Sequence, residues 1–315
     1  MCDPSRQKRG GAVPPAGGRT RHPRSTTRGA HGRARARRHA SAAVGPGGPR
    51  TDSRTASRRS PTLSPGSPIV DAMHRLTYAM KLAYDGAAFR GWQRQPGLPT
   101  VQQAMEDAIA SLLGERVRVH GAARTDAGVH AEGQVASFAV RRSLPPGAWY
   151  ELRVPDRLRI VAASPARPGF HARSSANGKR YRYRFAAGSP LAWDLGRTTP
   201  DWDRARAALL GLRGLPHLAG LASPSRGSRP APPLDEWSLS AEAETAELTI
   251  RAPAFRKHQI RNLAGHLAAV ALGLATPESL GQLARGLRPW HGATAPAHGL
   301  TLLEVLYPPE LDPFR

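Results

Sequence analysis

Apolar and polar residues start to alternate at Leu76, and from there the chain divides into distinct elements. The stretch LTYAMKLAYDG predicts a strand over 76–84 that enters a turn at its Asp-Gly pair. A polar segment, AAFRGWQRQPGLP, then leads to a predicted helix. Thr100 and Gln103 have the spacing of a capping box, apolar residues recur on one helical face, and Gly114 ends the helix.

The later part of the chain mixes strand patterns with helix patterns. The same reasoning predicts strands over 116–122, 134–140, 178–185, 234–240, 246–252 and 300–308, and helices that begin near Asp201, span 256–273 and follow Pro277. Hairpin-like and crossover pieces therefore occur together. This order predicts an α+β architecture.

Residues 1–72 differ from the rest of the chain in composition. They contain no Phe, Trp or Tyr and are rich in Arg, Gly, Pro, Ser and Ala, which predicts a disordered basic tail. Three interpretations remain open: an RNA-binding arm, a transit-like segment, or a true translation start at Met73 or Met80. The abrupt onset of patterned sequence after Met73 favours the last of these.

Charge extends beyond the tail. The formal net charge is +23, of which residues 1–72 contribute +12 and residues 73–315 contribute +11. A basic folded body favours a polyanionic partner such as nucleic acid, although a solvated basic surface that aids solubility explains the same numbers. The single cysteine, Cys2, excludes an internal disulfide and fits a cytoplasmic protein, and no apolar run is long enough to predict a membrane helix.

The densest group of reactive residue types lies in the predicted loop between the strands at 116–122 and 134–140. Arg124 and Asp126 are two residues apart there, so a guanidinium could pair with the carboxylate across a tight turn and orient it. An oriented carboxylate can act as a nucleophile or a base. The alternative is an ordinary loop in which Asp126 caps a turn and Arg124 forms a surface ion pair.

Five sequence motifs, one of which contains Asp126, are spread over about 76–308. They are YDGAAFRGWQRQ (84–95), ARTDAGVHA (123–131), FHARSSANGKRYRYRF (170–185), KHQIRN (257–262) and APAHGLTLLEVLYP (295–308). In this order they resemble the motifs of the TruA family of tRNA pseudouridine synthases. Chance can explain one such match, but not five in sequence.

The resemblance implies both a fold and an activity. The fold would have two related α+β halves, at 73–185 and 186–315, whose mixed antiparallel sheets flank a basic active-site cleft. The activity would be isomerisation of uridine to pseudouridine in the anticodon stem-loop of tRNA, without a cofactor or metal, by a cytoplasmic homodimer.

Four site residues follow from the resemblance. Asp126 matches the catalytic aspartate, and Arg124 matches an arginine that pairs with it and helps to hold the target base out of the helix. Tyr181 matches the tyrosine that stacks on the target uracil. Arg261 matches an active-site arginine that contacts the catalytic carboxylate.

Strand alternation over 178–185 gives these roles a physical basis. Tyr181, Tyr183 and Phe185 share one face, while arginines occupy the other. One face can thus offer an aromatic platform and the other can reach phosphates, although a half-buried strand with a solvated basic face shows the same alternation. The expected RNA-binding residues are Arg90, Gln93, Lys179, Arg180 and Arg182.

Other chemistry is not indicated by the sequence. There is no P-loop, dinucleotide-binding or H-E-x-x-H motif, and the histidines do not cluster like metal ligands. We expect His130, His171 and His258 to make structural hydrogen bonds or to touch RNA. Departures from the family pattern at 217–233 and 256–259 keep an alternative open, a tRNA-binding or tRNA-folding protein that has lost useful catalysis. A nucleic-acid binder driven by the basic tail is a third interpretation.

Overall fold

The computed structural model describes residues 75–196, 198–223, 231–289 and 292–315. All of them belong to the unit Pro61–Arg315, the larger of two units in the chain. The predicted disordered tail at 1–72 lies outside the described residues, as does part of the divergent segment 217–233.

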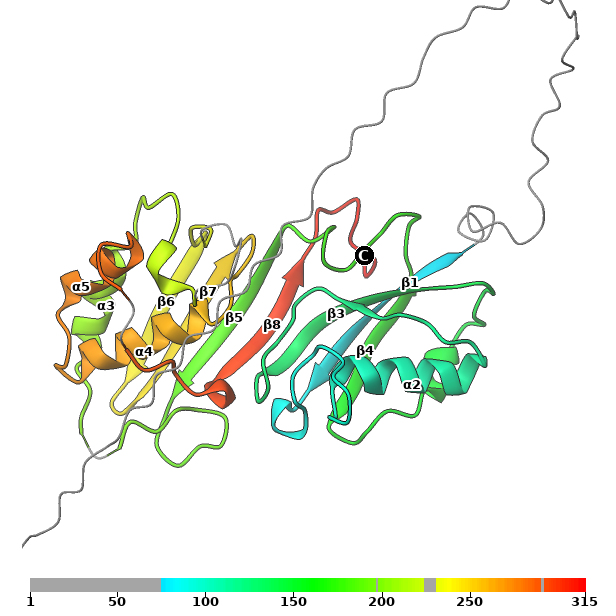
Figure 1. Cartoon of the computed structure of the whole chain (residues 1–315), viewed down its shortest axis with the longest axis horizontal. Helices are drawn as coiled ribbons and strands as arrows, with labels where there is room; N and C mark the ends of the chain where they lie inside the picture. Colours follow the sequence, from blue (N-terminus) through cyan, green and yellow to red (C-terminus); the bar gives the residue numbers. More distant parts are fainter. Residues whose placement is uncertain (1–74, 197, 224–230, 290–291) are drawn as a thin grey trace, which may run out of the picture. The chain divides into compact units, whose positions relative to one another are not determined.

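One mixed sheet runs through the described residues in the order β4-β1-β3-β8-β5-β7-β6, with β2 paired to β3 beside this path (Figure 1). Among the described strands, neighbours are antiparallel except for β3 and β8, which run parallel. The strands are β1 (Leu76–Tyr84), β2 (His120–Gly121), β3 (His130–Val140), β4 (Leu158–Pro165), β5 (Gly178–Phe185), β6 (Glu236–Glu242), β7 (Thr245–Ala252) and β8 (Leu300–Leu306).

Strand β8, the last in sequence, occupies the middle of the sheet between β3 and β5. It joins the strands β4, β1 and β3 to the strands β5, β7 and β6, so the two sides share one continuous sheet instead of forming separate ones. The predicted α+β class is confirmed. The proposed division at 185 stays a prediction, although β5, which lies before it, pairs with β7 and β8.

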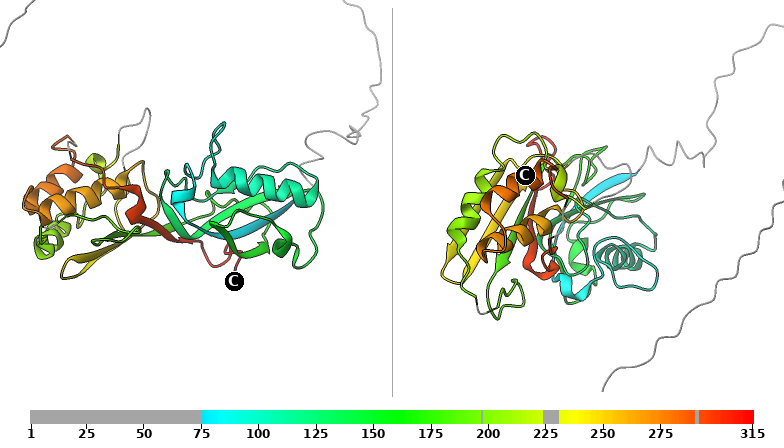
Figure 2. Two further views of the ribbon diagram at one scale, coloured as in Figure 1. Left: turned by 90° about the horizontal axis from the view of Figure 1, so that it is seen from below. Right: turned by 60° about the vertical axis from the view of Figure 1, so that its left-hand side comes forward.

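Four α-helices accompany the sheet in the described residues: α2 (Val101–Leu113), α3 (Trp202–Leu210), α4 (Gln259–Ala271) and α5 (Pro277–Ala284). Helices α2 and α4 lie on the same side of the sheet (Figure 2). Thr100 caps α2 by accepting the Gln103 N–H, and Gly114 ends it in a left-handed conformation, as predicted. Large apolar side chains fill the space between helices and sheet, among them Trp92, Met105, Tyr183, Phe185, Leu248 and Leu263.

One strand prediction was wrong in extent, and one strand was missed. The predicted strand over 116–122 is reduced to β2, because its ladder with β3 contains only the pairs at Ser137 and Ala136. Just before β2, the N–H of Val119 donates to the Glu106 carboxylate instead of to a neighbouring strand. Strand β4 was not predicted, because it lies at the edge of the sheet and its side chains are only partly buried.

The parallel pair β3–β8 requires a glycine at position 133. A Cβ added there would lie 2.2 Å from the Leu303 carbonyl oxygen, which belongs to the backbone and cannot rotate away. We expect Gly133→Ala to lower the free energy of unfolding by about 2–3 kcal/mol, measured by urea denaturation. Gly178→Ala is the matched control, since its Cβ would meet only side-chain atoms, the nearest being the tip of Leu306 at 3.2 Å. Equal losses in the two variants would contradict this account.

Candidate active site

Asp126 lies in a loop, residues 122–129, that connects β2 to β3 and is held by buried hydrogen bonds. Gln134 on β3 accepts from the Ala123 N–H at 3.1 Å and donates to the Ala123 carbonyl at 2.8 Å. The hydroxyls of Tyr84 and Thr125 are 2.8 Å apart. Burial raises the pKa of Tyr84 to about 12, so this hydroxyl stays neutral. The backbone on either side of Asp126 is therefore rigidly placed.

The segment 84–95 supports the same loop from outside. Gly91 has φ +89°, and a Cβ there would lie 2.8 Å from the Thr125 carbonyl oxygen, which also accepts the Trp92 N–H at 3.0 Å. Gly86 approaches the Val129 carbonyl still more closely, and its N–H donates to Nδ1 of His130 at 3.1 Å. This glycine-containing motif thus positions the Asp126 loop through backbone contacts.

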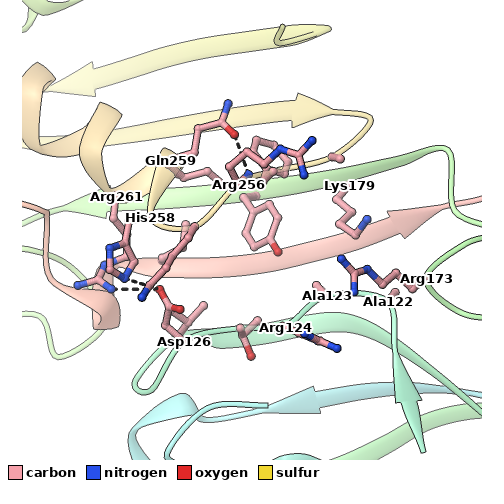
Figure 3. Close-up of a pocket in the computed structure, with 18 residues that line it drawn as sticks. Ala122, Ala123, Arg124, Asp126, Arg173, Lys179, Arg256, His258, Gln259 and Arg261 are labelled. Atoms are coloured by element: carbon pink, nitrogen blue, oxygen red, sulfur yellow. Dashed lines mark hydrogen bonds and ion pairs between the residues drawn. The ribbon is translucent and has the colours of Figure 1, made fainter. Parts of the chain in front are cut away.

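The carboxylate of Asp126 faces the side chains of Arg261 on α4 and of His258, the residue just before α4 (Figure 3). Its Oδ2 accepts a hydrogen bond from Arg261 at 3.2 Å and lies 3.6 Å from Nε2 of His258. Arg261 is held in turn by Ala295, whose carbonyl accepts from the Arg261 Nε at 2.7 Å. The predicted contact between Arg261 and the carboxylate is therefore present.

The predicted ion pair between Arg124 and Asp126 is absent from the contacts of the described residues. Arg124 is exposed and points away from Asp126, towards the end of the pocket where Arg173 lies (Figure 3). The reason is local: Asp126 starts a turn closed by the Val129 N–H on the Asp126 carbonyl, and α4 supplies the partner of its carboxylate. The two-residue spacing predicted Arg124 as the partner of Asp126, but the turn does not bring the two side chains together.

A pocket of about 440 Å³, here called the Asp126 pocket, opens beside the carboxylate. Tyr181 is buried in its wall and meets Phe255 edge-on, with ring centroids 5.1 Å apart. Burial, with Asp126 as a smaller cause, raises the pKa of Tyr181. Asp126 is the only acidic residue among the described lining residues, whereas six are cationic: Arg124, Arg173, Lys179, Arg256, Lys257 and Arg261. The pocket is thus shaped for a planar ring carried by an anionic chain.

The expected RNA-binding residues lie in different surroundings, and only one of these described residues lines the Asp126 pocket. Lys179 lines the Asp126 pocket, and burial lowers its pKa, with Arg173 as a second cause. Arg90 is exposed on the loop after β1, and Gln93 hydrogen-bonds Gln102 of α2 at 2.9 Å.

Arg180 and Arg182 project from the opposite face of β5. Arg180 lies 2.8 Å from Glu304, and Arg182 lies 2.6 Å from Glu132. Each of the two therefore has an acidic partner on that face, and the expectation that they contact RNA stays a prediction.

Sequence reasoning missed the position of His258. Its Nδ1 lies 2.9 Å from the Ser223 hydroxyl, and its backbone has φ +60°, an uncommon conformation for a residue other than glycine. Burial lowers its pKa although Asp126 acts in the other direction. The available signal was its place three residues before Arg261, about one helical turn away.

The described residues contain no group of three or more His, Cys, Asp or Glu side chains placed to hold a metal ion. None of their helices has both the length and the apolar character needed to cross a membrane.

Comparison with known proteins agrees with this geometry. The sequence profile of the tRNA pseudouridine synthase family matches residues 80–173 and 226–308. tRNA pseudouridine synthase A of Geotalea uraniireducens is 36% identical over 238 residues, covering 72% of this chain and 97% of that protein. The enzyme of the same name from Solidesulfovibrio magneticus is 39% identical over 249 residues, covering 72% and 90%.

One solved structure, a crystal structure of the archaeal box H/ACA sRNP Nop10-Cbf5 complex, matches over 61% of this chain and 43% of that one. Its TM-score of 0.27 and 11% identity are too low to carry an argument. The profile match and the curated relatives are sufficient, and with the placement of Asp126 they show that the chain belongs to the tRNA pseudouridine synthase family.

Proposed function

We propose that this chain isomerises uridine to pseudouridine in the anticodon stem-loop of tRNA, with Asp126 as its catalytic carboxylate. Family membership supports the reaction. The observation that carries the assignment of the site is the placement of Asp126 at the mouth of a cation-lined pocket, 3.2 Å from Arg261 and beside the buried ring of Tyr181.

The reaction is an internal rearrangement. The bond between ribose C1′ and uracil N1 breaks, the base turns, and a bond from C1′ to C5 forms while the C5 proton leaves and N1 gains a proton. Atoms and electrons balance without an external oxidant or reductant. Asp126 can act by attacking uracil C6, by attacking the ribose carbon or by abstracting a proton. Arg261 orients the carboxylate in each of these routes, because it is itself anchored on Ala295.

The target base must leave its helical stack to reach Asp126. Extrusion costs a few kcal/mol, and stacking on an aromatic ring returns about 1–3 kcal/mol. Tyr181 lines the pocket with its ring fixed by Phe255. Its hydroxyl has no hydrogen-bond partner among the described residues, so it is free to meet the substrate.

An in vitro assay tests the function. The full chain is incubated with unmodified tRNA transcripts labelled with tritium at uracil C5, and tritium release reports the exchange of the C5 proton. We expect release from transcripts with uridines in the anticodon stem-loop and none when those uridines are replaced by cytidines. Tight binding without release in single-turnover conditions would instead support the tRNA-folding alternative, which the divergent Gln259 in the pocket wall motivates.

Two substitutions of Tyr181 separate its ring from its hydroxyl. Tyr181→Leu removes the stacking surface and should lower the single-turnover rate by roughly 10- to 100-fold. Tyr181→Phe keeps the ring and should stay within about fivefold of the wild type, since only one hydrogen bond is at stake. Equal rates in Tyr181→Leu and the wild type would show that the ring does not hold the base.

We further infer a cytoplasmic homodimer, which the family resemblance supports. Analytical ultracentrifugation of the full chain at micromolar concentration tests the dimer: a monomer mass would contradict it.

A further inference from the structure

A second, smaller cavity adjoins the Asp126 pocket and is lined mainly by cationic and polar groups. It has a volume of about 110 Å³ and shares Arg124 and Arg173 with the larger pocket. Arg118, His120 and His171 complete its titratable lining, and none of the described residues that line it is acidic. We call it the arginine cavity.

The three arginines of this cavity are unpaired. The side chains of Arg118, Arg124 and Arg173 are exposed and form no hydrogen bond or ion pair with any described residue. Four arginines of β5 and β7 differ, because each of them contacts a carboxylate: Arg180, Arg182, Arg184 and Arg251. The fold therefore neutralises these four arginines and leaves Arg118, Arg124 and Arg173 without a carboxylate partner among the described residues.

Neighbouring groups experience this positive potential. Burial lowers the pKa of His120, and the nearby His171 and Arg118 lower it further, while Glu106 acts as the smallest cause in the other direction. The two imidazole rings lie 4.9 Å apart. His171 accepts the Arg173 and Ser174 N–H groups at Nδ1, which leaves its proton on Nε2 as a further donor. The cavity thus combines guanidinium and imidazole donors in a volume suited to one small anion.

We propose that the arginine cavity binds a backbone phosphate that flanks the target uridine. The inference rests on the proposed function, because the shared residues Arg124 and Arg173 place the cavity directly beside the pocket for the extruded base. Extrusion rotates the nucleotide about its backbone. A phosphate held by guanidinium groups would anchor the strand beside the pocket, equally before and after the base is extruded.

Arg118 allows the arginine cavity to be tested apart from catalysis, because it lines this cavity and not the Asp126 pocket. We expect Arg118→Gln to weaken tRNA binding roughly tenfold at physiological salt, and to reduce the slope of log K against log salt by about 0.7–0.9. The single-turnover rate at saturating tRNA should stay within about twofold, and the melting temperature should not change. Nitrocellulose filter binding and tritium release provide the two readouts.

Arg184→Gln is the matched control. It removes the same charge from the opposite face of the sheet, where Arg184 contacts Glu247 at 3.0 Å. Its tRNA affinity and salt slope should match the wild type. The proposal is overturned if Arg118→Gln weakens binding no more than Arg184→Gln, or if it lowers the saturated rate by more than about tenfold.

A chemical substitution in the RNA identifies the ligand. Transcripts carrying one neutral methylphosphonate, 5′ or 3′ to the target uridine, are bound to the wild type and to Arg118→Gln. At one of the two positions, the affinity lost through the methylphosphonate and the affinity lost through Arg118→Gln should not add. The reason is that the variant already lacks the contact between Arg118 and that phosphate. Additive losses at both positions would overturn the assignment to a flanking phosphate. Absence of tritium release from the wild type would reject the proposed function separately, since binding is measured without turnover.

Discussion

Asp126→Asn will lower the single-turnover rate of pseudouridine formation by about 10³-fold or more. The amide keeps the size of the carboxylate but removes its negative charge, so it can neither attack carbon nor take a proton. Arg261 and His258 remain in place, and the cation-lined pocket is unchanged. Binding of tRNA should therefore stay within about threefold of the wild type. Tritium release measures the first effect and filter binding the second.

Asp203→Asn is the appropriate control for this experiment. Asp203 lies in the first turn of α3, exposed, and lines no part of the Asp126 pocket. Its substitution should leave the rate unaltered. A rate for Asp126→Asn within about tenfold of this control would remove Asp126 from the chemistry and favour the tRNA-folding interpretation.

Arg261→Lys should lower the single-turnover rate by about 10²-fold, and Arg261→Gln by more. The guanidinium makes two contacts at once, donating from Nε to the Ala295 carbonyl and from a terminal nitrogen to Asp126. A lysine carries the charge but presents it from one atom, so it cannot keep both contacts. The free Ala295 carbonyl should also lower the free energy of unfolding by about 1–3 kcal/mol.

A double-mutant cycle distinguishes a partner of Asp126 from a purely structural arginine. If Arg261 acts by orienting the carboxylate, adding Arg261→Gln to Asp126→Asn should cost little further rate, because the group to be oriented is already lost. Its effect on the unfolding free energy should persist in both backgrounds. Multiplicative losses in rate would show that Arg261 acts independently of Asp126.

Local patterns predicted most of the elements correctly because their determinants are close in sequence. Thr100, the apolar face after it and Gly114 specify α2 without help from the rest of the chain. The alternation in GKRYRYRF likewise specifies β5 and separates Tyr181 from the arginines beside it. The errors at β2 and β4 arise where a strand depends on which neighbour is available at the edge of β3 or β1.

The residue pattern alone placed Asp126 in a loop between strands, and the resemblance to the family motifs implied Arg261 as its companion. The pattern could not decide which side chains meet the carboxylate, because Asp126 and Arg261 are 135 residues apart. That contact depends on β8, which pairs parallel to β3 from His130 and Thr301 onward. Parallel strands start at the same edge of a sheet, so the loop before β3 and the Ala295 segment before β8 come together there, and Arg261 is anchored on Ala295. The face of β5 that carries Tyr181 borders the Asp126 pocket. Arg180 and Arg182 lie on the other face of this strand.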